Sequence, residues 1–515
     1  MKGTVAMGYL RLFWRLLRFV TIQLPVIAVL AVAALAILEN LDLLSFDGAL
    51  LIGIAAIGAI LAGILCFLPL GNRPQSHGTA RFATIAEIRK AGLRREGLII
   101  GKQRDGFLRF DRPGHLLTFA PTRSGKGVGC VIPNLIDYPG SVFVTDIKGE
   151  NYCATAQIRQ KFGPVHAIAP FDDYACNAAF NPLDSIRQGS ASDVDDARLV
   201  AEMLVTSNAG EDGHWEREAR TLITGLLLYI VTERPGAQRN LAELRDLLMR
   251  SSACFDDLLK AIVDGGHPIA SRIADGFGQK EAKERSSIIS TAQAATAIFD
   301  SPALANVTRH STFSFERMKR ETRTVYLIVP PEYLSAYQPF MRLMVGLATT
   351  AMTRDSAAPK HPVLFLLDEL PALGHMRPIE DGIGYLAGYG ARLWLFVQDL
   401  DQLQQTYRKW RSMIANCVVR QAFNVQDPAT ARYLADMLGQ ATIRVTNDGK
   451  SSPMPLPWLP STFSSSTSEI ARDLLTPDEI MALPGNEQLL FIQGIRPIKA
   501  TKVRYFHDQR HLVKS

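Results

Sequence analysis

One short loop has the residues needed to hold phosphate groups. Residues 120–127 (APTRSGKG) follow an apolar run and lead into a predicted helix that begins near Gly127. Consecutive backbone N–H groups, a helix N-terminus and a lysine together can bind the phosphates of a nucleotide such as ATP. Ala120 stands where the first glycine of the pattern is expected, and Gly127 where a serine or threonine would ligate Mg²⁺; a plain strand-to-helix turn is the alternative. The predicted nucleotide-binding residues are Ala120, Pro121, Thr122, Arg123, Ser124, Gly125, Lys126, Gly127 and Val128.

Two adjacent acids form a second chemical landmark. The apolar run 363–367 (VLFLL) reads as a buried strand and ends in Asp368 and Glu369. In phosphate-loop ATPases an aspartate at this place helps to hold Mg²⁺, and the following glutamate orients or deprotonates the attacking water. The sequence therefore predicts Asp368 as the metal ligand and Glu369 as a catalytic residue, beside Lys126.

Two further polar residues end predicted strands. Gln398 follows residues 392–397 and is predicted to be catalytic, by sensing the γ-phosphate or holding the lytic water; the alternative is a glutamine that satisfies a neighbouring backbone group. Asp146 ends the β-branched run 141–145, where an ordinary strand-to-helix cap is an equal alternative. Ligands of open α/β sheets bind at the carboxyl ends of parallel strands, where all these side chains would meet.

The elements that position these residues predict an α/β fold: a P-loop NTPase, RecA-like, with a mainly parallel sheet. Residues 447–468 are rich in Gly, Ser and Pro and predict a mobile surface loop. Residues 488–492 and 502–506 predict a closing hairpin. Further strands are expected at 98–101, 116–120, 165–169, 324–329 and 418–424.

A long internal stretch predicts helices only. They are expected at 195–204, 215–231, 241–249, 254–263 and 280–299, which indicates an all-α domain inserted into the α/β domain. Trp215, Leu222, Leu226 and Tyr229 are predicted to form one buried helix stripe. The predicted domains are a membrane anchor (1–71), the nucleotide-binding domain in two parts (72–183 and 312–515), and the all-α domain between them (184–311).

Two uncharged runs near the N-terminus, 19–38 and 48–70, are each long enough to cross a bilayer as a helix. Basic residues precede the first run and follow the second, whereas the connector carries only acids. The positive-inside rule then predicts a two-pass protein of the bacterial inner membrane with both termini cytoplasmic. A signal peptide is the rival interpretation, which the second run disfavours. The net charge of +6 permits contact with nucleic acid, and the six scattered cysteines suggest no structural metal site.

Several longer stretches occur together in a recognisable order. They are GTARFATIAEIRKAGL (78–93), VIPNLIDYPGSVFVTDIKGE (131–150), NPLDSI (181–186), LDELPALGHM (367–376), LAGYGARLWLFVQDLDQL (386–403) and LLTPDEIMALPGNEQLLFIQG (474–494). With the two N-terminal runs and the phosphate loop, this order resembles the TraG-type coupling proteins of type IV secretion and conjugation systems over nearly the whole chain.

The resemblance implies a homo-hexameric, inner-membrane ATPase that uses ATP and Mg²⁺. Its cargo would be a relaxase attached to single-stranded DNA, delivered to other type IV secretion components, and the all-α domain would meet that cargo. A receptor for protein effectors is the alternative; a septal DNA translocase is a third, which lacks support because no further spans or winged-helix module are evident. The resemblance also implies an arginine from the neighbouring subunit, for which Arg392, Arg411 and Arg420 are candidates, and Thr122, Ser124 or a water in place of the missing Mg²⁺ hydroxyl.

Overall fold

The computed structural model describes residues 76–104, 106–172, 175–205, 213–451 and 462–512. The predicted membrane spans 19–38 and 48–70 lie outside these residues. No helix in the described part of the chain combines the length and the apolar character that a membrane crossing requires. The described chain divides into two compact units, one holding residues 77–441 and 471–515, the other including residues 442–470.

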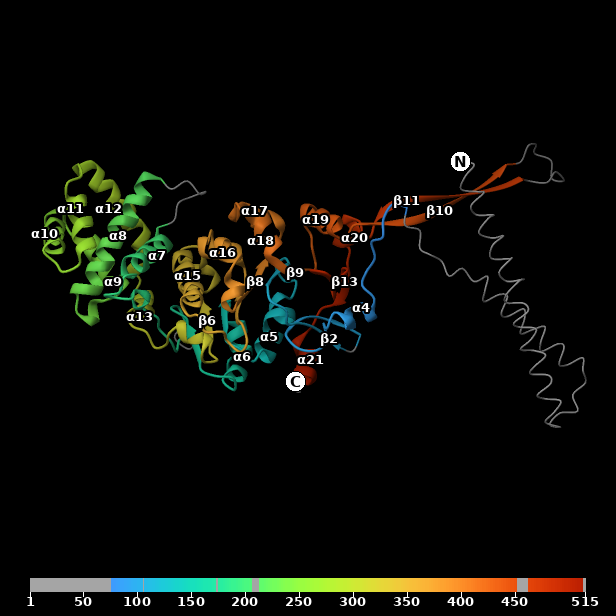
Figure 1. Cartoon of the computed structure of the whole chain (residues 1–515), viewed down its shortest axis with the longest axis horizontal. Coiled ribbons are helices and arrows are strands. Elements are labelled where there is room, and N and C mark those ends of the chain that lie inside the picture. Colours follow the sequence, from blue (N-terminus) through green and yellow to red (C-terminus); the bar gives the residue numbers. More distant parts are fainter. Residues whose placement is uncertain (1–75, 105, 173–174, 206–212, 452–461, 513–515) are drawn as a thin grey trace, which may run out of the picture. The chain divides into compact units, whose positions relative to one another are not determined.

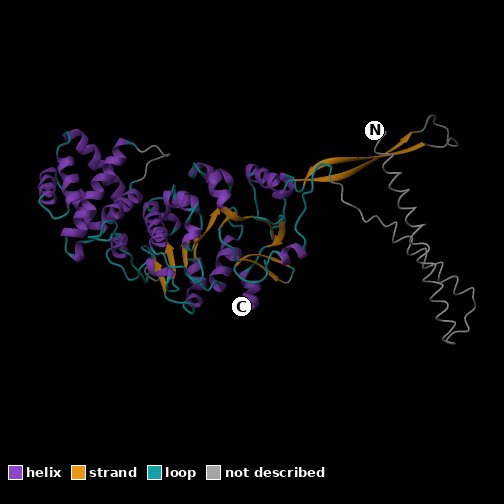
Figure 2. Cartoon of the chain, viewed as in Figure 1, coloured by secondary structure: helices purple, strands orange, loops and turns teal. Residues whose placement is uncertain are grey.

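Eleven strands of the described chain form one sheet in the larger unit, with the order β2-β1-β13-β12-β9-β3-β8-β7-β4-β6-β5 (Figures 1 and 2). The seven strands from β9 to β5 are parallel, and the four at the other edge pair antiparallel. The predicted mainly parallel α/β fold is confirmed. The strands are β1 (Leu98–Gln103), β2 (Gly106–Phe110), β3 (His115–Phe119), β4 (Val142–Asp146), β5 (Val165–Ile168), β6 (Thr324–Ile328), β7 (Val363–Leu367), β8 (Ala391–Val397), β9 (Cys417–Ala422), β12 (Glu487–Ile492) and β13 (Ile498–Thr501).

The central strands are buried and mainly apolar because both faces of the sheet are covered. β3, β4, β6, β7 and β8 are buried along their whole length. Alternate side chains enter opposite cores: Phe365 and Leu367 join one cluster, and Leu364 and Leu366 the other. The helices outside the inserted domain are α4 (Ile85–Lys90), α5 (Ile132–Asp137), α6 (Glu150–Arg159), α14 (Pro331–Leu334), α15 (Gln338–Arg354), α16 (Arg377–Gly382), α17 (Leu400–Thr406), α18 (Trp410–Asn416), α19 (Pro428–Leu438), α20 (Pro477–Met481) and α21 (Tyr505–Leu512).

The inserted stretch folds into helices, and its described residues contain no strand (Figure 2). Helix α8 contacts α7, α11 and α12 and lies at the centre of this helical domain. Its Leu222 and Leu226 are buried as predicted, whereas Trp215 is 42% exposed and is not part of the core. Trp215 lies in the first turn of α8, and the buried residues of this helix begin only at Ala219. The helices are α7 (Asp193–Leu204), α8 (His214–Glu233), α9 (Leu241–Leu248), α10 (Ser252–Val263), α11 (Pro268–Gly278), α12 (Ala282–Thr296) and α13 (Pro302–Thr308).

Two of these helices, α11 and α13, were not expected from the sequence. Both begin with a proline in the first turn, and α11 ends in Gly-Phe-Gly, a composition typical of turns. Proline is compatible with the first helical turn because its missing N–H has no intrahelical partner there. The His267 side chain accepts the Ala270 N–H and caps α11.

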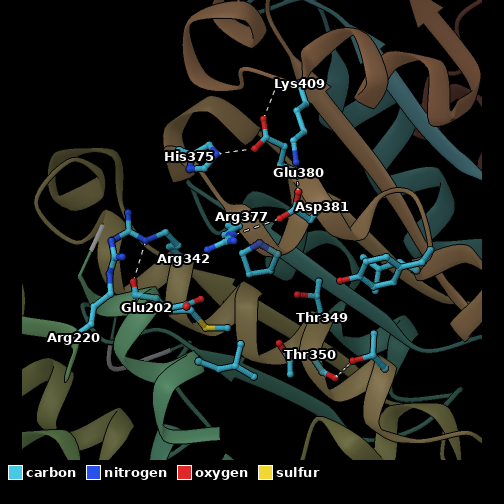
Figure 3. Close-up of a pocket in the computed structure, with 16 residues that line it drawn as sticks. Glu202, Arg220, Arg342, Thr349, Thr350, His375, Arg377, Glu380, Asp381 and Lys409 are labelled. Carbon is cyan, nitrogen blue, oxygen red and sulfur yellow. Dashed lines mark hydrogen bonds and ion pairs between the residues drawn. The ribbon is translucent and has the colours of Figure 1, made fainter. Parts of the chain in front are cut away.

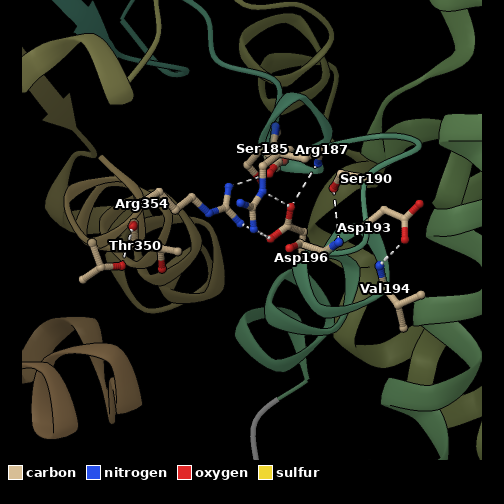
Figure 4. Close-up of polar contacts among 11 residues, drawn as sticks. Ser185, Arg187, Ser190, Asp193, Val194, Asp196, Thr350 and Arg354 are labelled. Atoms are coloured by element: carbon tan, nitrogen blue, oxygen red, sulfur yellow. Dashed lines mark hydrogen bonds and ion pairs between the residues drawn. The ribbon is translucent and has the colours of Figure 1, made fainter. Parts of the chain in front are cut away.

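An ion cluster around the buried Asp196 joins the helical domain to the nucleotide-binding domain (Figure 4). The Asp196 carboxylate, on α7, accepts hydrogen bonds from Arg187 at 2.8 and 2.9 Å and from Arg354, on α15, at 2.5 Å. Arg354 also donates to the Ser185 carbonyl oxygen at 2.6 Å. Burial opposes ionisation of Asp196, but the bonds from Arg187 outweigh it and hold its pKa below the usual value. We call Arg187, Asp196 and Arg354 the junction cluster.

Two predictions about the C-terminal third were wrong. Residues 447–468 are not simply a loop, because β10 (Gln440–Ser451) and β11 (Thr462–Asp473) form a two-stranded sheet. Residues 465–468, Ser-Ser-Thr-Ser, are exposed, and a strand that has solvent around it can consist of small polar residues. The closing hairpin pairs β12 with Ile498–Thr501 rather than with residues 502–506, and α21 begins at Tyr505.

Candidate active site

The loop after β3 has the conformation of a phosphate-binding turn. Arg123 and Gly125 both have positive φ, +59° and +89°. At Gly125 a larger residue would be strained by this backbone even though space around it is open. The helix that follows begins as a π-helical turn (Gly127–Val131) and continues as α5, so backbone N–H groups face the loop. Ala120 is buried and Thr122 is exposed.

The four residues predicted to act together meet at one edge of the sheet. β8 lies between β3 and β7, and the register pairs Phe119 with Val397 and Leu367 with Leu395. The carboxyl ends of the three strands are therefore adjacent. The Lys126 Nζ lies 2.5 Å from Glu369 Oε2 and 3.5 Å from Asp368 Oδ1, and the Gln398 amide donates to the other oxygen of Glu369.

Glu369 is held in an uncommon backbone conformation. Its φ is +56°, the left-handed region, in which residues other than glycine are rare and often functional. The chain turns there from β7 into a 3-10 helix (Leu370–Leu373), which aims the Glu369 side chain at Lys126 and Gln398. The same turn is supported from outside, because Gln338 at the start of α15 donates to the Ala372 carbonyl oxygen at 3.0 Å.

The charges at this edge influence one another. Burial opposes the charge of Lys126, but the carboxylates of Asp368 and Glu369 outweigh it, so the pKa of Lys126 lies above its usual value. Burial and the neighbouring Glu369 raise the pKa of Asp368, against the opposing effect of Lys126. Asp146 ends β4 in the same region, and burial raises its pKa to about 6. Its carboxylate accepts hydrogen bonds from the Tyr152 N–H and the Asn151 amide, so it caps α6.

The carboxyl group of Asp368 fits a metal ligand. Its Oδ1 is buried and accepts no hydrogen bond in the described structure, which leaves a hard oxygen available for a cation such as Mg²⁺. Ser124, one candidate for the hydroxyl ligand absent at Gly127, donates its Oγ hydrogen to the Pro121 carbonyl oxygen at 2.6 Å. A side-chain oxygen does lie near Gly127. Asn151 Oδ1 is 3.6 Å from the position that a Cβ atom on residue 127 would occupy.

A contact that sequence reasoning missed ties the C-terminal segment to the loop. Lys502, just after β13, donates to the Ser124 carbonyl oxygen at 2.9 Å and to Asn424 Oδ1 at 2.6 Å, and its ammonium lies over the Phe423 ring. Burial lowers the pKa of Lys502. Only the pairing of β12 with β9, next to β3, brings Lys502 to the loop, and no local motif marks it.

The three arginine candidates lie in different surroundings. Arg392 is buried at the amino end of β8, the far end from Gln398, and donates to the carbonyl oxygens of Asp111 and Arg112. Its guanidinium is therefore held within its own chain. Arg411 is exposed on α18, over the Trp410 ring, and Arg420 donates to the Cys417 carbonyl oxygen from β9.

Comparison with known proteins places this geometry in a family. Residues 81–514 match the family model described as Type IV secretory system Conjugative DNA transfer. The conjugal transfer protein TraG of Escherichia coli is 30% identical over 494 residues, covering 84% of this chain and 77% of that protein. Protein VirD4 of Agrobacterium fabrum is 28% identical over 453 residues, covering 84% and 66%.

Solved structures share the fold. The plasmid coupling protein TrwB in complex with the ATP analogue ADPNP superposes with a TM-score of 0.64 at 15% identity, covering 85% of this chain and 96% of that chain. TrwB in complex with ADP and Mg²⁺ gives 0.62 at 15% identity, covering 84% and 97%. Since the family model spans most of the chain, the protein belongs to the family of type IV secretory system conjugative DNA transfer proteins, the type IV coupling proteins.

Proposed function

We propose that this coupling protein hydrolyses ATP at the edge formed by β3, β8 and β7. The observation that supports the proposal is the meeting of Lys126, Asp368, Glu369 and Gln398, which come from three separate parts of the sequence. The TrwB structures with nucleotides have the same fold. Phosphates would lie against the N–H groups of residues 122–128, and Lys126 would exchange Glu369 for phosphate oxygens.

That exchange would release the catalytic acid. Once Lys126 binds phosphate, the Glu369 carboxylate, still held by Gln398, is free to accept a proton from water as the water oxygen attacks the γ-phosphorus. The bond to the β–γ bridging oxygen breaks, and ADP leaves with that oxygen. Mg²⁺, when bound, neutralises charge on the phosphate oxygens, and Asp368 would hold it, with Asn151 close to the place of the missing hydroxyl.

The larger assembly is also part of the proposal. The spans 19–38 and 48–70 would anchor the protein in the bacterial inner membrane with both termini cytoplasmic. Six copies would form a ring in which Arg411 or Arg420 reaches the nucleotide of the next subunit. Hydrolysis would then drive transfer of a relaxase with its single-stranded DNA into the type IV secretion channel.

The test is ATP turnover by the full chain in detergent, with and without single-stranded DNA. Glu369→Gln is expected to lower turnover by about 10²-fold or more while nucleotide still binds, because the variant keeps the shape and loses the base. Glu332→Gln, at an exposed site on α14, is the matched control and should behave as the unaltered protein. Equal turnover in Glu369→Gln and the unaltered protein contradicts the assignment. Mass measurement of the same sample tests the ring, and preferential capture of effector proteins over relaxase–DNA would contradict the cargo.

A further inference from the structure

A pocket of about 560 Å³ lies where the helical domain meets the nucleotide-binding domain (Figure 3). It is lined by parts of α7 and α8 on the helical side and, on the other, by α15, α16, the segments on either side of α16, and Lys409, which precedes α18. Its size is that of a pocket for a small organic ligand. It does not include any of the residues assigned to the nucleotide.

A buried arginine faces this pocket with few partners. Arg342, in the middle of α15, is 5% exposed, and its Nε donates to the Met203 carbonyl oxygen at 3.1 Å. Among the described residues it makes no ion pair and no other hydrogen bond, so its two terminal N–H₂ groups are available to the pocket. A buried guanidinium normally has a carboxylate or several carbonyl groups around it.

Other buried arginines of this protein follow that rule. Arg159 donates to the carbonyl oxygens of Leu135, Tyr138 and Gly140 and to the Thr324 hydroxyl. Arg245 is paired with Asp300 at 2.7 Å. Burial lowers the pKa of both Arg159 and Arg342 to about 10, but only Arg159 is surrounded by acceptors.

Most of the other charged groups around the pocket are already paired, and Arg220 donates its Nε hydrogen to the Val205 carbonyl oxygen at 2.9 Å. Asp381 binds Lys409 at 2.6 Å and Arg377 at 3.4 Å, and Glu380 binds His375 at 3.0 Å. These carboxylates in the pocket wall, with that of Glu202, disfavour a polyanion such as a DNA strand. The rest of the wall combines the threonines of α15 (Thr349, Thr350 and Thr353) with a larger group of apolar or aromatic side chains, which are Leu199, Met203, Pro378, Tyr385 and Leu386.

We propose that the pocket binds a single carboxylate on an apolar stem, with the carboxylate seated on the Arg342 guanidinium. A guanidinium and a carboxylate match in charge and can form two parallel hydrogen bonds. The carboxylate belongs either to a small organic acid or to the free C-terminus of a peptide that ends in an apolar residue. Such a ligand would touch α7, α15 and α16 together and so bridge the helical domain and the segment that follows Glu369.

The probe is hexanoate, with hexanol as the uncharged match, added to the full chain in detergent and followed by saturation-transfer NMR. We expect saturable binding of hexanoate that Arg342→Met weakens at least tenfold and Arg342→Lys partly restores. Arg377→Gln, which alters an arginine already paired, should change the affinity less than threefold. If Arg342→Met does not fold, Leu199→Trp fills the pocket without altering its charge and should abolish binding.

Competition distinguishes the sources of the carboxylate and can overturn the proposal. The competitors are a tetrapeptide with a free apolar C-terminus and its C-terminally amidated form. If only the free form displaces hexanoate, the ligand is the C-terminus of a peptide. If both peptides displace hexanoate equally weakly, the ligand is a small organic acid. Binding of hexanol as strong as that of hexanoate, or equal hexanoate binding in Arg342→Met, overturns it. So does a tetranucleotide that displaces hexanoate better than either peptide. None of these readouts requires ATP, so their outcome is independent of the proposed hydrolysis.

Discussion

The edge of the sheet at Lys126, Asp368, Glu369 and Gln398, which we call the nucleotide edge, and the junction cluster both surround a buried aspartate with charged groups, but the two aspartates are held differently. At the nucleotide edge Lys126 faces two carboxylates, and Asp368 keeps one buried oxygen without a hydrogen bond. In the junction cluster both carboxylate oxygens of Asp196 accept hydrogen bonds from arginines. The difference indicates that the first set of charges is arranged to be exchanged for a ligand and the second to fix two domains together.

The largest expected effect tests the first half of this comparison. Lys126→Ala should lower ATP turnover by about 10³-fold, because the only side-chain cation in contact with both acids is lost from the phosphate site in the described structure. The free energy of unfolding should fall less than in a cluster whose carboxylate stays ionised, because burial and Glu369 already raise the pKa of Asp368, which can take up a proton when Lys126 is absent. Turnover and thermal unfolding of the same preparation check both. Equal ATP turnover in Lys126→Ala and the unaltered protein would show that Lys126 is not part of the site of ATP hydrolysis.

The junction cluster should show the opposite behaviour. Asp196→Asn leaves Arg187 and Arg354 without their carboxylate and should lower the free energy of unfolding by about 3 kcal/mol, measured by denaturant unfolding. Asp195→Asn is the control on the same helix, because Asp195 is exposed and 3.6 Å from Arg198, and should cost less than about 0.5 kcal/mol. Similar decreases in the free energy of unfolding for Asp196→Asn and Asp195→Asn would show that the junction cluster does not stabilise the contact between the two domains.

A smaller effect refines the account of the nucleotide edge. Gln398→Ala removes the amide that holds Glu369 and should lower turnover by about tenfold, the value of one hydrogen bond of about 1.4 kcal/mol. The loss should appear in kcat rather than in KM for ATP. Gln402→Ala, one turn further on and bonded to the Gln398 N–H, should have a weaker effect. A loss confined to KM would assign Gln398 to binding.

The smallest effect concerns pH and the junction cluster. The pKa of Asp196 in the folded protein lies below its ordinary value of 3.8. Its contribution to stability is therefore complete above that ordinary value and is lost as pH falls through the lower, folded pKa. The difference in unfolding free energy between Asp196→Asn and the unaltered protein should be constant from pH 5 to 8 and shrink below about pH 4. A difference that already shrinks between pH 7 and 5 would contradict ionised pairing.

The sequence was sufficient to predict the nucleotide edge because its parts are local. Each strand is a mainly apolar run. Asp368, Glu369 and Gln398 follow two of these runs closely, and Lys126 follows the third at the end of one short loop. The core of the helical domain was predicted from the 3.6-residue period of helices such as α8. Trp215, however, lies on that period at the helix start and is exposed.

The features that escaped prediction depend on long-range pairing. Lys502 reaches the phosphate loop only through the order of β13, β12, β9 and β3. β10 and β11 consist largely of polar residues, and each is stabilised as a strand by the other, which no local pattern reveals. No sequence pattern singles out Arg342, because its distinguishing property is that it is buried with a single hydrogen bond among the described residues.

Helix α15 has a mechanical consequence. Its first residue, Gln338, holds the turn after Glu369; Arg342 lies one turn further on; and Arg354, its last residue, holds the junction cluster. Seventeen helical residues form a rod of about 25 Å. Because this rigid helix is attached at both ends, a displacement of the turn after Glu369 must also move the junction cluster. In the opposite direction, a force on the helical domain must be transmitted through α15 to Asp368 and Glu369.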